Sequence, residues 1–291
     1  MRAAMIQALR RFFIHHGYLE VETPNRVATL APEPHIDAVV SEGCYLHTSP
    51  ELLMKRLLAA GYEKIFQITR CYRKAERGRL HLPEFTLLEW YDAGKDYRHL
   101  MDECEDLFLA VARDLGRGDS LSCDGVDISL KKPWERLSVA EAFRRYGGVS
   151  LEKALDLGRF DEIMVERIEP ALGPQPLFLC DYPISRGALA RRKAFDQTMV
   201  ERFELYIGGL ELANAFSELV DQEEQRDRFE QDSAERARQG KDPYPPQERF
   251  LEALAFMPEA AGIALGIDRM AMLFADKKSI DDVVAFTPEE L

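Results

Sequence analysis

Two pairs of alternating segments constrain the fold of this chain more than any other feature of its sequence. Residues 64–73 and 84–91 alternate polar and apolar side chains, and the polar, mostly basic segment 74–83 joins them. A second pair, residues 195–207 and 210–219, meets at two glycines. Period-two alternation is typical of strands with one buried face, and such neighbours pair antiparallel. The sequence therefore predicts a mostly antiparallel sheet.

Helical patterns surround these strands. Apolar spacing predicts an N-terminal helix that ends near Gly17, and a strand that then runs to Pro24. We expect Ser49 as the N-cap of a helix with Pro50 in its first position. Further segments follow helical spacing or small-residue strand patterns: 52–60, 97–115, 222–239, 250–256, a strand at 177–182, and a strand at 262–266 that leads into a last helix. We expect one α+β domain over residues 1–291, with a helical insertion at about 133–173.

Composition excludes several classes of protein. The chain has 291 residues, 38 basic against 51 acidic, and a formal charge of −13, while 46% of residues are apolar. Such a chain is too apolar for disorder, and its net charge does not favour a nucleic-acid backbone. The longest apolar run, residues 260–267, is too short for a membrane helix, and the N-terminus lacks a signal-peptide core. Five cysteines without a CxxC motif indicate a reducing compartment, so we expect the cytoplasm.

The first strand pair places candidate ligand-binding groups on one face. Phe85, Leu87, Glu89 and Tyr91 share a face by alternation, and Arg73 ends the preceding strand. An aromatic ring stacks on a base, and a guanidinium binds a phosphate through two hydrogen bonds. These residues suit a nucleotide together with an amine. A core phenylalanine and an exposed arginine remain the alternative.

The second strand pair carries carboxylates around its glycine turn. Glu204 and Glu211 offer the oxygen ligands that Mg²⁺ prefers. Asn214, Phe216 and Glu218 share a face, and strict alternation puts Glu211 on the opposite face from Asn214. A β-bulge must therefore intervene if both point into one site. Solvent-exposed acids are the alternative.

A third cluster lies where the small-residue strand meets the last helix. Gly262 and Gly266 let the backbone approach a ligand closely, and Arg269 adds a cation. The segment lacks the GxGxxG spacing of a dinucleotide-binding loop.

The order and spacing of these clusters resemble the class II aminoacyl-tRNA synthetases of the lysyl subgroup. More narrowly, the chain is similar to the branch of that subgroup that modifies elongation factor P. The resemblance covers essentially the whole chain. It rests on the helix and strand ending at Pro24 (motif 1), Thr48-Ser-Pro-Glu51-Leu, Tyr72-Arg73 with His81-Leu-Pro-Glu-Phe85-Thr-Leu-Leu-Glu89-Trp-Tyr91 (motif 2), Glu211-Leu-Ala-Asn214-Ala-Phe216-Ser-Glu218-Leu, and Gly266-Ile-Asp-Arg269 (motif 3).

The resemblance implies an ATP-dependent ligase that forms an aminoacyl-adenylate and pyrophosphate, with Arg73 and Arg269 as catalytic residues. Arg73 would bind the α-phosphate and the substrate carboxylate, and Phe85 and Arg269 would enclose adenine. His81 would reach the distal phosphates, and Glu204 and Glu211 would hold Mg²⁺. The family's motif 2 usually has an acid where Ala75 stands, and Glu76 is the substitute for it if the loop shifts by one residue.

The resemblance also implies the amino-acid site. Glu51 would bind an amino group and Asn214 the carboxylate. Glu89, Tyr91 and Glu218 would hold a side-chain ammonium, with Phe216 lining the slot. Ala264 stands where lysyl-tRNA synthetases typically have Gly and the branch that modifies elongation factor P has Ala.

The implied substrates are lysine or (R)-β-lysine, with elongation factor P as the acceptor. Because motif 1 begins at the first residues, we expect no OB-fold anticodon-binding domain before it, and tRNA is not an expected partner. The resemblance and the apolar N-terminal segment together imply a homodimer. A short lysyl-tRNA synthetase and a non-catalytic regulatory paralogue stay open as alternatives.

Overall fold

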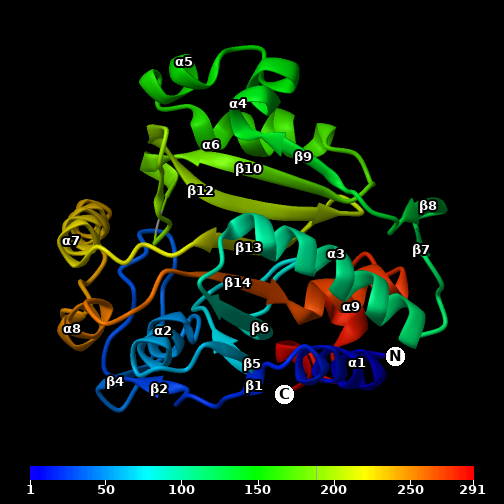
Figure 1. Cartoon of the computed structure of the whole chain (residues 1–291), viewed down its shortest axis with the longest axis horizontal. Helices are drawn as coiled ribbons and strands as arrows, with labels where there is room; N and C mark the ends of the chain where they lie inside the picture. The colour runs from blue at the N-terminus through cyan, green and yellow to red at the C-terminus, as the bar shows by residue number, and fades with distance from the viewer. Residues whose placement is uncertain (188) are drawn as a thin grey trace.

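The central sheet is continuous across the molecule (Figure 1). The computed structural model describes residues 1–187 and 189–291, and within these nine strands form this sheet. Their order is β1 (Leu19–Glu20), β5 (Lys64–Tyr72), β6 (Glu84–Ala93), β14 (Ala260–Gly266), β13 (Leu210–Ser217), β12 (Asp196–Ile207), β10 (Leu177–Pro183) and β9 (Glu135–Ser138), with β11 (Arg192–Lys193) beside β12. Strands β1 and β5 pair parallel, as do β9 and β10, and the other neighbours pair antiparallel. The expected α+β class with a mostly antiparallel sheet is confirmed.

Two small sheets and the helices complete the fold. The small sheets are β2 (Arg26–Val27) with β4 (Cys44–Leu46) and β3 (Val39–Ser41), and β7 (Ser120–Cys123) with β8 (Val126–Ser129). The α-helices are α1 (Arg2–His15), α2 (Glu51–Ala59), α3 (Tyr97–Asp114), α4 (Val139–Ala142), α5 (Leu151–Asp156), α6 (Phe160–Ile163), α7 (Gln222–Arg238), α8 (Glu248–Leu254) and α9 (Ile267–Ala275). Helices α4, α5 and α6 lie together beside β9 and β10, at one end of the sheet (Figure 1). No helix in the described part of the chain is long and apolar enough to cross a membrane.

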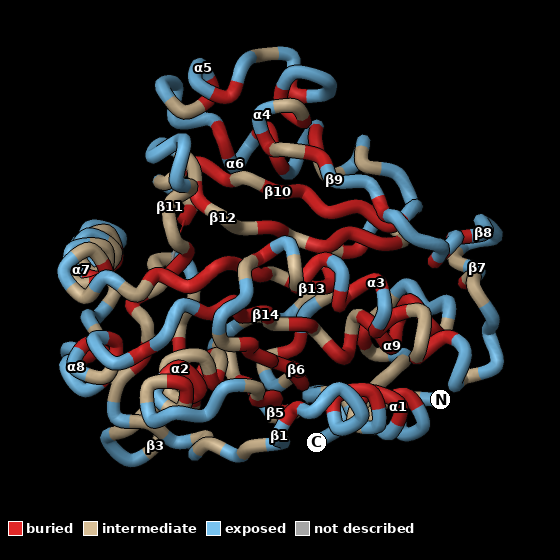
Figure 2. The backbone as a smooth tube through the Cα atoms, viewed as in Figure 1, coloured by how far each residue is buried: buried red, intermediate tan, exposed pale blue. Residues whose placement is uncertain are grey.

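The sheet has a separate apolar core on each face, and its central strands are the most continuously buried segments (Figure 2). On one face, Leu88 and Trp90 of β6 pack with residues of α1, α3 and α9. Tyr91 and Phe216 belong to the other core, with residues of α2 and α8. Successive strand residues point to opposite faces. The candidate residues of β6, which are Phe85, Leu87, Glu89 and Tyr91, therefore lie on the face away from α3.

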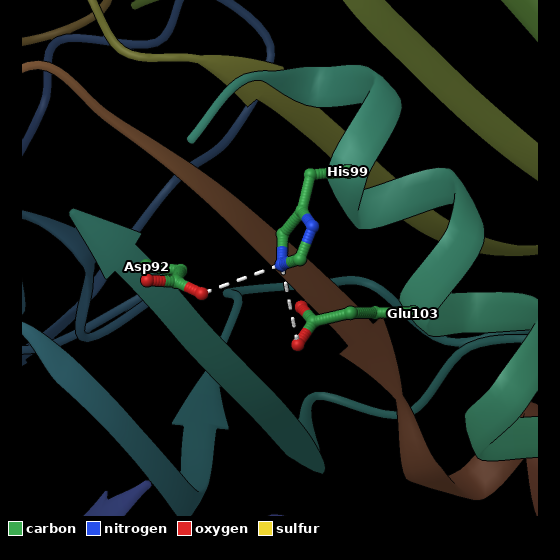
Figure 3. Close-up of side chains that lie close together, drawn as sticks. All are labelled: Asp92, His99 and Glu103. Carbon is green, nitrogen blue, oxygen red and sulfur yellow. Dashed lines mark ion pairs between the residues drawn. The ribbon is translucent and has the colours of Figure 1, made fainter. Parts of the chain in front are cut away.

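A polar cluster fastens α3 to the sheet (Figure 3). His99 Nε2 lies 3.3 Å from Asp92 Oδ2 and 3.6 Å from Glu103 Oε1. Lys64 Nζ lies 3.3 Å from the same Asp92 oxygen, and the Tyr18 hydroxyl donates to both Glu103 oxygens at 2.7 and 2.8 Å. The two carboxylates thus already have a cationic or hydroxyl partner, and the cluster joins β5, β6 and α3.

Two local expectations were wrong in detail. The strand expected to run to Pro24 is limited to β1, where Leu19 is 51% exposed, because the chain pairs with β5 only at Leu19 and Glu20. Pro50, rather than Ser49, is the N-cap of α2. Ser49 still serves the helix start, since its Oγ accepts a hydrogen bond from the Glu51 N–H at 3.0 Å.

Candidate active site

A cavity of about 330 Å³ opens on the sheet face away from α3. Its wall is formed by the loop before β3, the start of α2, the loop between β5 and β6, and β6, β13, β14 and the start of α9. The sequence candidates on this wall are Glu51, Arg73, Glu76, His81, Phe85, Glu211, Asn214, Ala264 and Arg269. The three candidate clusters, from the two strand pairs and from the start of the last helix, therefore meet at one cavity.

Two arginines stand at one end of the cavity. The Arg73 guanidinium lies over the Phe85 ring at 4.9 Å from its centroid. Arg269 donates to the Glu211 carbonyl oxygen at 2.7 Å, lies 3.3 Å from the Glu211 carboxylate, and contacts His81 Nε2 at 2.6 Å. Burial and the neighbouring Arg269 charge lower the pKa of His81. This end of the cavity is suited to phosphate groups.

The loop at Ala75 brings Glu76 to this wall. Ala75 has a φ of 62°, in the left-handed region, which turns the chain directly after Arg73. Glu76 lines the cavity, and its carboxylate lies 3.7 Å from the Arg73 guanidinium. An acid thus faces the cavity next to Arg73, one residue later than in the usual family sequence.

A bulge places the β13 candidates on one side of the sheet. Tyr206 pairs with Glu211 while Leu205 pairs with Ala213, so β13 has one extra residue at this point. Glu211 and Asn214 both line the cavity as a result. The β-bulge that strict alternation required between Glu211 and Asn214 is therefore confirmed.

Glu204 and Glu211 form a carboxylate pair on neighbouring strands. Glu204 accepts hydrogen bonds from the Tyr182 hydroxyl at 2.7 Å, the Tyr206 hydroxyl at 2.9 Å and Arg202 at 2.7 Å. Burial and the nearby Glu204 charge raise the pKa of Glu211. Because a divalent cation relieves such repulsion, these residues fit Mg²⁺ through oxygen ligands.

Some of the expected site residues do not line the cavity. Among the residues that the structure describes, these are the four expected around the side-chain ammonium, Glu89, Tyr91, Phe216 and Glu218, and the expected Mg²⁺ ligand Glu204. Glu89 accepts hydrogen bonds from Ser49 Oγ at 2.5 Å and the Tyr91 hydroxyl at 3.1 Å. Burial raises the pKa of Glu89 to about 8, and the pKa of Glu218 likewise to about 8. Both carboxyl groups therefore bind a proton more tightly than an ordinary glutamate does.

Lys55 connects these deep acids to the cavity, and sequence reasoning missed it. Its Nζ lies 2.5 Å from Glu51 on the wall and 2.5 Å from the buried Glu218, and 5.0 Å from the centroid of the Phe216 ring. The two close carboxylates raise the pKa of Lys55, against the effect of burial. The one available signal was its position four residues after Glu51 on a helix.

Ala264 lines the cavity beside residues that we expect to bind the amino acid. It is the register partner of Asn214 on β13 and of Glu89 on β6. Its methyl group therefore lies between the residue expected to hold a carboxylate and a residue expected to hold an ammonium.

The fold is that of a class II synthetase. The family model for the class II tRNA synthetases (D, K and N) matches residues 1–290, and the chain belongs to this family. The family expected from the sequence motifs is confirmed.

Curated relatives specify the branch of the family. The elongation factor P–(R)-β-lysine ligase of Salmonella dublin is 39% identical, over 98% of this chain and 93% of the relative. The ligase of the same name from Erwinia tasmaniensis is also 39% identical, and that from Salmonella paratyphi B is 38% identical, with the same coverage. This chain is therefore similar over nearly its whole length to elongation factor P–(R)-β-lysine ligases.

Proposed function

We propose that this protein is an ATP-dependent ligase that activates lysine or (R)-β-lysine as an adenylate and transfers it to a lysine side chain of elongation factor P. The observation that carries the proposal is a single cavity that Arg73 and Arg269 line together with Ser49 and Glu51, through which it adjoins the buried carboxylates of Glu89 and Glu218. The names of the relatives supply the acceptor and the β-lysine substrate.

In the first step, the carboxylate of the amino acid attacks the α-phosphorus of ATP and pyrophosphate leaves. Arg73 stabilises the negative charge on the α-phosphoryl oxygens, and Phe85 stacks on the purine. Arg269 and His81, which contact each other, bind the nucleotide as well. Positioning both reactants in one cavity makes the attack effectively unimolecular.

Mg²⁺ would be held by Glu204 and Glu211 and would neutralise the departing phosphate charge. Both residues belong to a pair whose mutual repulsion already raises the pKa of Glu211. The fit rests on this repulsion and on the oxygen ligands.

The acidic end selects a diamino acid by charge. Glu51, Glu89 and Glu218 carry three carboxylates, and Lys55 neutralises one of them. The two ammonium groups of lysine or β-lysine balance the remaining charge, while Arg73 and Asn214 bind the carboxylate. Ala264 limits where the amino group nearest the carboxylate can lie.

The first test is exchange of labelled pyrophosphate into ATP, with α-lysine and (R)-β-lysine as separate substrates. We expect exchange with at least one of them, and loss of exchange in Arg269→Ala without loss of folding. Absence of exchange with both amino acids would favour a non-catalytic regulatory paralogue. A homodimer in the cytoplasm is part of the proposal, supported by the family and by the free cysteines.

A further inference from the structure

A second, larger cavity meets the active-site cavity at its acidic end. It measures about 550 Å³ and shares Glu33, Ser49 and Glu51 with the first cavity. Apolar residues such as Ala28 and Leu30 make up much of its wall, which Arg26, Arg56 and Arg249 also line. A passage with apolar walls and carboxylates at its inner end complements a lysine side chain, which has an apolar stem and a charged head.

The second step of the proposed function needs such a passage and also a base. The acceptor lysine has an unperturbed pKa near ~10.4, so at neutral pH its ammonium must lose a proton before it can attack an acyl group. A base for this step must stand at the cavity and must not already be committed to another cation.

Glu33 meets this requirement. Its carboxylate makes no hydrogen bond or ion pair with any residue that the structure describes, although its backbone is held in place. The other titratable residues on the active-site wall already have partners: Glu51 with Lys55, Glu76 with Arg73, His81 and Glu211 with Arg269, and Asp268 with Arg2.

The charges around Glu33 suit proton exchange near neutrality. Burial raises the pKa of Glu33 to about 7, with the Arg73 charge opposing it. The carboxylates of Glu51 and Asp232 raise this pKa further, and Arg202 lowers it. A base with a pKa near the working pH combines a large ionised fraction with useful proton affinity.

Two residues that are distant in sequence, Arg236 and Lys241, hold the loop that carries Glu33. The buried Arg236 guanidinium donates to the carbonyl oxygens of Glu33 and Ile36, each at 2.8 Å. Lys241 Nζ donates to the Pro34 carbonyl oxygen at 2.8 Å. These bonds hold Glu33 at the junction of the two cavities.

We infer that the acceptor lysine enters through the second cavity and that Glu33 is the general base of acyl transfer, an inference that rests on the proposed function. Glu33 takes one proton from the ammonium, and the freed lone pair attacks the acyl carbon of the adenylate. The bond from this carbon to the AMP phosphate oxygen breaks, and AMP leaves with its electron pair. The second proton of the nitrogen passes to the AMP phosphate and then to solvent as the amide forms.

The experiment separates transfer from activation. Enzyme with preformed adenylate is mixed with elongation factor P, and the single-turnover transfer rate is compared with the pyrophosphate-exchange rate of the same preparation. For Glu33→Gln we expect the ratio of transfer to exchange to fall about 100-fold, the typical loss for a general base. Wild-type transfer should rise with pH through an inflection near 7, which Glu33→Gln should lack and Glu33→Asp should retain.

Two further variants give the controls. Glu252→Gln changes an exposed glutamate of α8 that lines neither cavity, and it should keep the wild-type ratio and pH profile. Ala28→Trp narrows the second cavity and should raise the KM for elongation factor P more than the KM for the amino acid.

A wild-type ratio and inflection in Glu33→Gln would overturn this inference alone. Transfer and exchange that fall in equal proportion would also overturn it, because Glu33 would then only shape the site. Absence of exchange in the wild-type protein would instead overturn the proposed function, and this inference with it.

Discussion

Replacing Lys55 with methionine removes an ammonium that lies 2.5 Å from both Glu51 and Glu218, in a position only 1% exposed. Methionine retains most of the side-chain volume, so the loss is chiefly electrostatic. Removing one partner of a buried ion pair costs about 3–5 kcal/mol, because the remaining charge is left unpaired. In a chain of this size we expect the unfolding temperature to fall by roughly 6–15 °C.

The loss of stability in Lys55→Met should depend on pH. The folded-state pKa values of Glu89 and Glu218 are raised to about 8, above those of the unfolded chain. Their contribution to stability is therefore complete below the unfolded pKa of about 4.5 and is lost as the pH rises through 8. The Lys55 charge lowers the pKa of Glu218, so its removal raises this pKa further. At pH 6 the Glu218 carboxyl is protonated with or without Lys55, whereas at pH 8.5 it is ionised and paired in the wild type and has no cationic partner in Lys55→Met. The destabilisation should thus be larger at pH 8.5.

The assay is denaturant unfolding of wild type and Lys55→Met at the two pH values. Lys278→Met serves as a matched control, because Lys278 makes an exposed pair with Asp124 at 2.7 Å, and such pairs contribute about 0–1 kcal/mol. The double variant Lys55→Met with Glu218→Gln should recover part of the lost stability. A Lys55→Met protein as stable as the Lys278→Met control at pH 8.5 would refute the account of the acidic network.

Three more predictions concern the reaction. Arg73→Ala should lower pyrophosphate exchange at least about 100-fold with little change in unfolding temperature, since Arg73 serves the developing phosphoryl charge; substantial exchange in the variant would show that another residue has this role. Ala264→Gly should shift the ratio of kcat/KM for α-lysine and (R)-β-lysine by about 1–3 kcal/mol towards α-lysine, because one methyl group between Asn214 and Glu89 is removed; an unchanged ratio would remove Ala264 from the selectivity. Glu211→Gln should raise the Mg²⁺ concentration needed for half-maximal exchange, and an unchanged Mg²⁺ titration would contradict the metal assignment.

Much of the fold was predictable because alternation and helical spacing report which faces are buried. The expected strands at 64–73 and 84–91 correspond to β5 and β6, and the bulge near Glu211 followed from the requirement for a shared face with Asn214. Alternation failed at Leu19, because an apolar residue in a two-residue edge strand has no layer to cover it.

The parts of the site that escaped the sequence depend on contacts distant along the chain. Lys55 lies on a predictable helix, but its pairing with Glu218 arises only when the fold brings α2 next to the residue that follows β13. Glu33 lies in an aperiodic, proline-containing loop, and its position depends on Arg236, which no spacing rule relates to it. Local patterns specify helices and strands, whereas these groups are defined by tertiary packing.

The central claim is that one cavity makes an aminoacyl-adenylate and delivers it to a protein. Elongation factor P and tRNA-Lys offered together, with ATP and labelled α-lysine or (R)-β-lysine, test it most directly. We expect label in elongation factor P, bound as an amide that survives mild base. Label in tRNA alone would contradict the account and identify the chain as a short lysyl-tRNA synthetase.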